Sequence, residues 1–470
     1  MDAEPPQSSS LRRRPWPLLL ALLAAAAAYL LRARPQRLPP HLLGHPLRRF
    51  PALLDAGARA SLMRLAQEIA RFPTVTAAEA AYNITHEDIG EGREESPPDA
   101  RGLCAHPFLI PSTDGRRCIL PGRVDVGRHY VATGGLEGAK EQHADLLSRV
   151  QSFSRYLFEP LRHEATRSLF ADASFLAAAR SVCPADKQTL DPFQANLIIQ
   201  VPGQTVAAHI DGVWFHGASR FHVPQWLLAV MQFSGLFADR FIDQVQLVAY
   251  FHEWPGSFEE GGDFVFWHDG AALGAGGPER VRAAAGAGTA VDGSKTVHAA
   301  AVFRPGAAPP RLDKSRDNSL QFVAGNGAAG GAGAEWELVT DGRARRRYRA
   351  EELRFSVVYR ARCFGDDAAR ERFAAELAAR EGLLDLEDDI LAPLRAELVR
   401  RGRATPARLA AMSRLELAMT LMDAFIKYPK PAAAAALVPA NYCALPKLFP
   451  RSTWLQGAAD LFCPLRSLAD

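Results

Sequence analysis

The sequence has little net charge, few cysteines and no internal repeat. Its 55 Lys and Arg residues nearly balance 52 Asp and Glu residues, and the net charge of +3 gives no general case for nucleic-acid binding. The one basic run, residues 343–349, is interpreted as a solvated loop. No Cys-x-x-Cys occurs, which argues against a zinc ribbon or a thioredoxin-like site. The absence of repeats argues against a solenoid or a propeller.

Hydrophobic residues are plentiful, at 48% of 470 residues. A chain of this length and composition can bury a large core, and we expect one principal domain with helical additions. Residues 16–31 form an uncharged stretch rich in Leu and Ala, at the lower edge of the length that spans a bilayer. Arginines lie on both sides of it.

This stretch has three interpretations: a signal-anchor, a cleaved signal peptide or an organellar transit peptide. It is longer than a usual signal-peptide core, no clear small-x-small cleavage site precedes Arg32, and a transit peptide would be amphipathic. We therefore expect a single-pass type II anchor at residues 16–31, with the body of the protein in the lumen of the endoplasmic reticulum or Golgi. Secretion and an organellar location remain alternatives.

The cysteines and one sequon fit a lumenal location. Six cysteines are an even number, and Cys104 with Cys118 and Cys443 with Cys463 are candidate local disulfides. The sequence Asn83-Ile84-Thr85 is a glycosylation acceptor if this region enters the secretory pathway. A glycoprotein is therefore expected.

The rest of the chain is organised around residues 194–211. Residues 197–201 read as a buried strand, Pro202-Gly203 as a turn, and the chain then re-enters extended structure and delivers His209 and Asp211. Because residues i and i+2 of a strand point to the same face, this pair is suited to binding one metal ion. His143 and Asp145 have the same spacing, but residues 139–156 show helical periodicity and predict a solvated helix face.

Further strands are predicted downstream, in the order that a small β-barrel or jelly roll needs. They cover residues 245–251, 261–267, 288–293, 297–303 and 353–360. His298 lies on the fourth of these, and Arg354 and Ser356 share one face of the last.

Together, these residues resemble the 2-oxoglutarate/Fe(II)-dependent oxygenase superfamily, whose double-stranded β-helix carries His-x-Asp…His…Arg-x-Ser. The resemblance covers roughly residues 190–363. It implies that His209, Asp211 and His298 bind iron as a catalytic facial triad. It also implies that Arg354 and Ser356 hold the far carboxylate of 2-oxoglutarate, because the planar guanidinium matches a carboxylate and stays charged.

The resemblance further implies the reaction and its partners. Fe(II) and the co-substrate 2-oxoglutarate would react with O2, with ascorbate as a further possible cofactor, and a C–H bond of the substrate would be hydroxylated. The resemblance to lumenal prolyl and lysyl hydroxylases suggests that the substrate is a protein side chain. A small molecule or a lipid remains an alternative substrate. If side chains alternate regularly along these strands, Asn196 and Tyr250 point toward the co-substrate.

One spacing departs from the family pattern. The arginine usually follows the second histidine by about a dozen residues, whereas here 354 − 298 = 56 residues separate the two. Residues 304–349 are rich in Gly, Ala, Pro and Arg and are interpreted as an inserted loop, which costs little because loop-closure entropy grows only logarithmically with length. Arg360, six positions after Arg354 and on the same strand face, is the alternative carboxylate ligand.

The expected fold is α+β: a double-stranded β-helix (jelly-roll) core with N-terminal buttressing helices and a C-terminal helical extension. Its parts are a cytosolic tail and anchor (1–37), a stem and N-terminal helical and loop region (38–189), the oxygenase domain (190–363) with its insertion (304–349), and a helical region (364–470). Helices are expected at 53–72, within 141–180, and at 368–380, 385–401 and 405–427. The last region is suited to presenting substrate or to dimerisation, and the oligomeric state stays open.

Several aromatic and histidine residues have two interpretations. Trp214, Phe215 and His216 either line a substrate pocket or pack on the outer sheet. We interpret His222, His252 and His268 as structural rather than metal-binding.

Two other functions compete with an oxygenase. A non-catalytic jelly-roll binding protein of the secretory pathway would keep the fold without the reaction. A type II glycosyltransferase would suit the anchor, but the sequence lacks an Asp-x-Asp flanked by apolar strand residues.

Overall fold

The computed structural model describes residues 37–74 and 97–444, apart from gaps at 101, 103, 107, 113–114, 255–259, 269–277, 314–315, 325–334 and 432–439, together with residues 446, 454, 457 and 463. The expected anchor at 16–31 and the sequon at 83–85 lie outside this part. Among the described residues, no helix combines the length and the apolar character needed to span a membrane.

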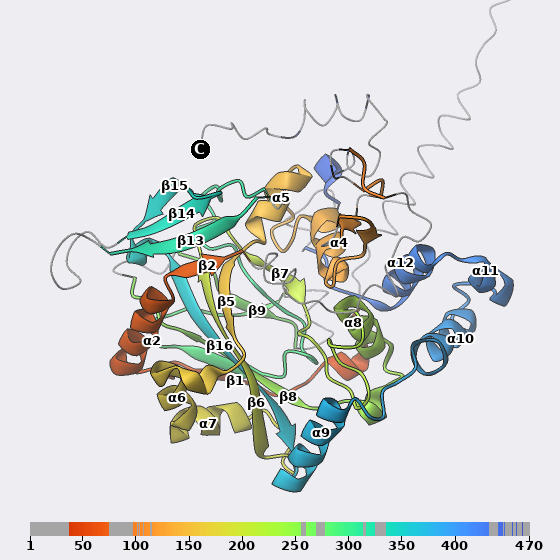
Figure 1. The fold of residues 1–470 in the computed structure, drawn as a ribbon, viewed down its shortest axis with the longest axis horizontal. Coiled ribbons are helices and arrows are strands. Elements are labelled where there is room, and N and C mark those ends of the chain that lie inside the picture. Colours follow the sequence, from red (N-terminus) through yellow and green to blue (C-terminus); the bar gives the residue numbers. More distant parts are fainter. Residues whose placement is uncertain are drawn as a thin grey trace, which may run out of the picture.

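Two antiparallel sheets form the centre of the molecule (Figure 1). The larger sheet has the strand order β1-β11-β8-β16-β6-β5, and the smaller has the order β10-β9-β12-β7. The bounds in the larger sheet are β1 Leu47–Phe50, β5 Phe153–Leu157, β6 Thr189–Gln200, β8 Gln244–Tyr250, β11 Gly288–Val291 and β16 Arg354–Phe364. Those in the smaller sheet are β7 Val206–His209, β9 Phe264–Phe266, β10 Glu279–Val281 and β12 His298–Ala300.

The chain passes repeatedly between these sheets. From β6 it crosses to β7, returns to β8, crosses to β9 and β10, returns to β11, crosses to β12 and ends in β16. Each strand predicted downstream of residue 194 is present in this path, and the mixed helix and antiparallel-sheet architecture is confirmed. The strand β10 is an addition that the sequence did not indicate.

The two faces of the larger sheet have different partners because side chains alternate along a strand. Leu197, Leu247 and Val357 lie on one face, in a core shared with helices α2 (Ala56–Ile69), α6 (Glu164–Ala171) and α7 (Ala173–Arg180). These helices cover that side of the sheet (Figure 1). The other face carries Val248 and Val358, which pack with Phe264 and Phe266 of the smaller sheet. Polar residues on this second face therefore lie between the two sheets.

The prediction that residues 304–349 form a loop is wrong for much of this segment. A third antiparallel sheet, ordered β15-β14-β13-β2, is built from β13 (Asn318–Val323), β14 (Glu335–Thr340), β15 (Arg343–Tyr348) and β2 (Arg71–Pro73). The physical reason is burial: Leu320, Trp336, Leu338 and Tyr348 join the core beneath it. The glycine-rich composition obscured these four apolar residues.

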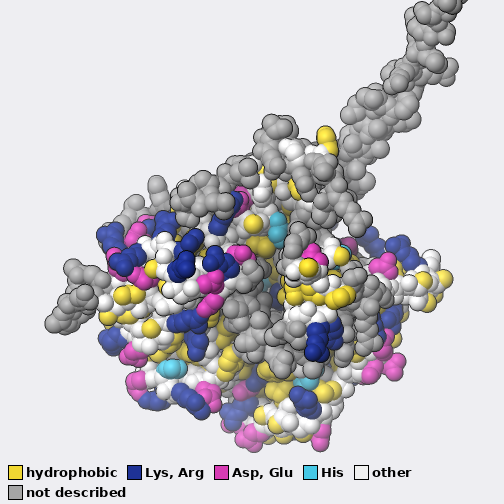
Figure 2. Space-filling model, turned by 45° about the horizontal axis from the view of Figure 1, so that its top comes forward, with side chains coloured by type: hydrophobic (Ala, Val, Ile, Leu, Met, Phe, Trp, Pro, Cys, Tyr) yellow, Lys and Arg dark blue, Asp and Glu magenta, His cyan; other side chains and the backbone are white. Residues whose placement is uncertain are grey.

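The basic run is likewise an edge strand rather than a loop. Residues Arg343 to Arg347 of β15 are exposed, and Lys and Arg side chains gather on this side of the molecule (Figure 2). Arg347 forms ion pairs with Glu335 and Glu337. Charged side chains on an unpaired edge also discourage the pairing of β15 with another chain.

The helical prediction for 139–156 is also corrected. Only α5 (His143–Arg149) is helical there, and Phe153–Leu157 is the edge strand β5, which pairs with β6. Asp145 is not on a solvated face: it is buried and forms an ion pair with Arg311. Phe153 and Leu157 enter the core at strand spacing, and sheet pairing outweighed the weak helical pattern.

The C-terminal region is helical, as expected. It contains α9 (Asp367–Ala379), a π-helical turn (η7, Leu386–Leu391), α10 (Ala392–Arg400), α11 (Pro406–Ala411) and α12 (Arg414–Phe425). Two helices were not foreseen, α4 (Val124–Thr133) and α8 (Gln225–Ser234). The core around α8 includes residues of α10 and α12, so this region packs against the end of the molecule that carries the smaller sheet.

Three disulfides link the described cysteines. Cys104–Cys118 and Cys443–Cys463 confirm the predicted local pairs. The third, Cys183–Cys363, joins residues 180 positions apart and ties the segment after α7 to the end of β16. Sequence spacing gives no indication of such a long-range pair.

We expect Trp336→Ala to lower the free energy of unfolding by about 3–5 kcal/mol, because it removes a fully buried indole from the core. Its ring lies 5.8 Å from that of Phe72 and 5.5 Å from that of Phe355. Val323→Ala on β13 is the control, since Val323 is 40% exposed, and it should cost less than about 0.5 kcal/mol. Urea unfolding measures both. Equal, small losses would show that the third sheet is not part of the core.

Candidate metal centre

Three predicted ligands meet at one end of the smaller sheet. His209 ends β7 and His298 begins β12, and the antiparallel pairing of these strands places the two histidines directly opposite each other. Their ring centroids are 4.4 Å apart. Asp211 lies two residues beyond the end of β7, where its amide donates to the Gly293 carbonyl oxygen over 2.8 Å.

The geometry suits a single cation. Oδ1 of Asp211 lies 3.6 Å from Nε2 of His209 and 3.9 Å from Nε2 of His298. One ligand atom from each of the three residues lies within 4.8 Å of the others, and no other such cluster of His, Cys, Asp or Glu occurs among the described residues. Two imidazoles and one carboxylate on one side of a cation form a donor set typical of non-haem Fe(II).

Hydrogen bonds fix both imidazoles in the tautomer that a metal needs. Nδ1 of His209 donates to the Ala207 carbonyl oxygen at 2.8 Å, and Nδ1 of His298 donates to the Thr296 carbonyl oxygen at 2.9 Å. Each Nε2 lone pair is then directed toward Asp211. Nε2 of His298 is buried and has no hydrogen-bond partner in the described part of the chain, an arrangement that a cation would satisfy.

The protonation states of the cluster also favour metal binding. Burial, and then the charge of His209, lower the pKa of His298 to about 4, so its imidazole is neutral near pH 7. Burial alone would raise the pKa of Asp211, but the charge of Arg360, together with the contributions of His209 and His298, holds the pKa well below its usual range. A neutral imidazole and an ionised carboxylate are the forms that bind metals.

Arg360 and Arg354 have different partners, although both lie on the inner face of β16. Arg360 forms an ion pair with Asp211. Arg354 is only 4% exposed and donates to Oε1 of Gln200 at 2.5 Å and to the Tyr250 hydroxyl at 3.3 Å. Among the described residues, no carboxylate pairs with Arg354. A buried guanidinium with only neutral partners is suited to binding an anion.

A glycine makes room for this arginine. A Cβ atom at Gly262 would lie 2.9 Å from Cδ and 3.0 Å from Nε of Arg354, and Gly262 has a φ of +71°. Both the close approach and the backbone conformation therefore require glycine. The Gly261-Gly262 turn before β9 thus positions the arginine.

The other predicted co-substrate residues lie nearby on the larger sheet. Ser356 is buried on β16 and is paired in register with Tyr250 of β8 and Ile198 of β6. Asn196 is buried on β6, and its Oδ1 has no hydrogen-bond partner among the described residues. The structure therefore gathers Asn196, Tyr250, Arg354 and Ser356 on the strands β6, β8 and β16.

The sequence indicated a turn at Asp292-Gly293, but not that this turn supports the ligands. The Asp292 carboxylate accepts from the amides of Gln244 and Ser294, and the turn carries the Gly293 carbonyl that holds Asp211. A Cβ at Gly293 would lie 2.2 Å from Oδ2 of Asp211. The Asp-Gly pair was visible as a turn signal, but its contact with Asp211 depends on tertiary structure.

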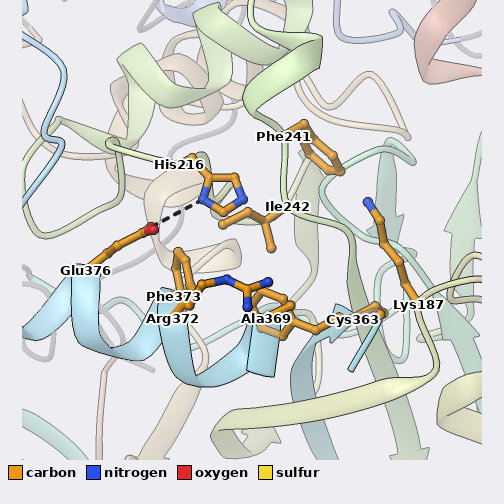
Figure 3. Close-up of a pocket in the computed structure, with 11 residues that line it drawn as sticks. Lys187, His216, Phe241, Ile242, Cys363, Ala369, Arg372, Phe373 and Glu376 are labelled. Carbon is orange, nitrogen blue, oxygen red and sulfur yellow. Dashed lines mark ion pairs between the residues drawn. The ribbon is translucent and has the colours of Figure 1, made fainter. Parts of the chain in front are cut away.

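The residues with two interpretations, Trp214, Phe215 and His216, do not gather at the metal ligands. Trp214 and Phe215 are buried in separate apolar clusters, which favours the packing interpretation. His216 lines a cavity of about 250 Å³ with Lys187, Phe241, Arg372 and Glu376, and none of the three metal-ligand candidates lines it. In Figure 3, His216 lies between Ile242 and Glu376, whose carboxylate is 3.6 Å from the imidazole.

Of the three histidines interpreted as structural, His252 and His222 have structural contacts, as expected. His252 is fully buried, its two ring nitrogens contact the carbonyl oxygens of Phe355 and Ala283, and its ring stacks on Trp254 at 3.6 Å. His222 contacts the Ser219 hydroxyl.

Comparison with known proteins gives a likeness of fold only. No family model and no curated protein matches the chain. Similar solved structures include a Pseudomonas putida prolyl-4-hydroxylase, at 10% identity and a TM-score of 0.29, which covers 68% of this chain and 92% of that one. Another is the non-haem α-ketoglutarate-dependent carbocyclase SnoK from nogalamycin biosynthesis, at 10% identity and a TM-score of 0.30, covering 68% and 80%.

A third is HygX from Streptomyces hygroscopicus, solved with nickel, 2-oxoglutarate and hygromycin B, at 8% identity and a TM-score of 0.28, covering 68% of this chain and 83% of that one. Likeness at this level identifies no activity.

We expect His298→Ala to abolish binding of Co(II), a spectroscopic substitute for Fe(II), because it removes one of three ligands. His143→Ala is the matched control, because His143 and Asp145 have the same spacing as His209 and Asp211 but lie on the helix α5. Calorimetric titration and the visible absorption of Co(II) measure the binding. Retained binding in His298→Ala, or its loss in His143→Ala, would contradict this assignment of ligands.

Proposed function

We propose that this chain is a 2-oxoglutarate- and Fe(II)-dependent dioxygenase that hydroxylates a protein side chain or a small molecule, with conversion of 2-oxoglutarate to succinate. The observation that carries the proposal is that a candidate metal site and a candidate anion site lie together between the sheets. A His-Asp-His cluster lies beside Arg360, and Arg354, a buried arginine with no acidic partner among the described residues, lies on the same strand as Arg360.

The strand order supports the fold that this function uses. The strands β6-β16-β8-β11 of the larger sheet face β7-β12-β9-β10 of the smaller, and the chain alternates between the two. We assign these eight strands to a double-stranded β-helix, with β1 and β5 as additions at the edges of the larger sheet.

Each residue of the site has a role under this proposal. His209, Asp211 and His298 would hold Fe(II), which when bound activates O2 for attack on a C–H bond. Arg354 would bind the distal carboxylate of 2-oxoglutarate with its guanidinium, and the Tyr250 hydroxyl at 3.3 Å helps to hold the guanidinium in place. Asn196 and Ser356 offer further polar groups on the same face. Arg360 would keep Asp211 ionised and in a fixed orientation.

The three disulfides support an oxidising compartment, and we propose the lumen of the secretory pathway as the location. The membrane anchor at 16–31, glycosylation at Asn83 and a role for ascorbate stay predictions. The substrate stays open between a protein side chain and a small molecule.

We expect anaerobic addition of Fe(II) and 2-oxoglutarate to produce the weak visible absorption band of the chelated co-substrate. Arg354→Met should weaken 2-oxoglutarate binding on the order of 100-fold, because a charge-assisted contact to a carboxylate is lost. It should leave Co(II) binding near the wild-type value. Arg362→Met is the control: it removes another buried arginine of β16, one that pairs with Asp191 at 2.6 Å.

The same preparation separates the two functional classes. Under air, an oxygenase converts 2-oxoglutarate to succinate slowly even without its substrate, whereas a jelly-roll binding protein does not. A folded wild type that binds Co(II), but shows neither the absorption band nor succinate, would contradict the proposed function and favour the binding protein.

A further inference from the structure

The backbone between two of the candidate metal ligands is held by a side chain from another part of the fold. Arg123 directly precedes α4, and its Nη1 donates to the carbonyl oxygen of Ile210 over 2.9 Å. Ile210 is the residue between His209 and Asp211 and is fully buried. Movement of this carbonyl therefore moves both neighbouring ligands.

Arg123 is itself fixed from two sides. Nε and Nη2 donate to the two carboxylate oxygens of Asp125, at 3.1 and 3.0 Å, and Nη2 also donates to the Tyr428 hydroxyl at 3.1 Å. That hydroxyl in turn donates to Oδ2 of Asp125 over 2.7 Å. A bidentate carboxylate and a shared hydroxyl leave the guanidinium little freedom to turn.

Tyr428 comes from the C-terminal region, three residues after the end of α12. It is only 1% exposed, and its ring packs edge-on against Phe233 of α8 at 5.3 Å and His129 of α4 at 5.6 Å. The hydroxyl therefore reaches Asp125 and Arg123 from a packed, fixed ring. The contact connects two residues, Tyr428 and Asp125, that are 303 positions apart in the sequence.

We propose that Arg123 and Tyr428 are positioning residues for the metal centre, and that the C-terminal helical region thereby forms part of it. Neither side chain binds the metal. Arg123 holds the Ile210 carbonyl, Asp125 and Tyr428 hold Arg123, and together they keep His209 and Asp211 in the ligating geometry. The inference rests on the proposed function only in requiring that the three ligands bind a metal.

The alternative is a network that only stabilises the packing of the C-terminal region. The two possibilities differ in metal affinity, because supporting partners of metal ligands typically change affinity by about 10- to 100-fold when they are removed. If the network is purely structural, disrupting it would change the melting temperature but leave the metal affinity of the folded protein unchanged.

The experiment is Co(II) titration of the full chain, followed by calorimetry and visible absorption. Arg123→Lys keeps the positive charge beside Asp125 but loses the fork that reaches both Asp125 and Ile210, and we expect Co(II) binding about 10- to 100-fold weaker. Tyr428→Phe keeps the packed ring and removes only the hydroxyl, and we expect a smaller loss, on the order of 10-fold. Both variants should alter the Co(II) absorption spectrum, since the ligand geometry changes.

Tyr359→Phe is the matched control. Tyr359 is fully buried, but it lies on the helix-covered face of β16, and its hydroxyl has no partner among the described residues. Its Co(II) affinity and spectrum should equal those of the wild type. Melting temperatures of all four proteins separate loss of stability from loss of affinity.

Two results would overturn the inference. Variants that melt at lower temperature, but bind Co(II) with the wild-type affinity and spectrum, would show a purely structural network and leave the proposed function intact. A folded wild type that binds no Co(II) would overturn the metal centre and this inference together. Weakened Co(II) binding in both variants supports the inference even if 2-oxoglutarate does not bind, so the two proposals fail separately.

Discussion

The candidate site depends on the pairing of β7 with β12, which places His209 opposite His298. In an antiparallel pair, residues directly opposite each other bring their side chains close on one face. Asp211 lies just beyond the end of β7. The hydrogen bond from its amide to the Gly293 carbonyl oxygen fixes the backbone there. A shift of one residue in this register would turn one histidine to the other face and destroy the cluster.

Two arginines on β16, the half-buried Arg360 and the buried Arg354, give the space between the sheets its electrostatic character. Arg360 neutralises the one carboxylate of the metal centre, whereas Arg354 has only neutral partners among the described residues. A buried charge without an opposite charge is costly, and proteins retain such a charge mainly where a ligand completes it. The contrast between the two arginines is therefore the strongest sign of an anionic ligand beside a metal.

The surrounding elements keep this arrangement rigid. The helices α2, α6 and α7 cover one face of the larger sheet, and the third sheet adds Trp336 and Leu338 to the same core. The inserted residues 304–349 thus stabilise the strand that carries both arginines, because Trp336 packs against Phe355 of β16. On the opposite side, the segment after α12 contributes Tyr428 to the contacts around Ile210.

The sequence by itself determined the local features: the strands around residues 194–211, 245–251 and 353–360, the two short-range disulfides, and the residue types of the site. These follow from short-range patterns, since side-chain alternation, turn residues and cysteine spacing act over a few residues. His209 with Asp211 could be distinguished from His143 with Asp145 because the first pair follows a strand and a turn.

Only the tertiary structure decided which distant residues meet. The pairing of Arg360 with Asp211, the Cys183–Cys363 disulfide and the contact of Tyr428 with Asp125 depend on how sheets and helices pack. The strands β5 and β13 to β15 were missed for the same reason. Their local patterns are weak, and the burial of a few apolar side chains against neighbouring strands outweighs local propensity.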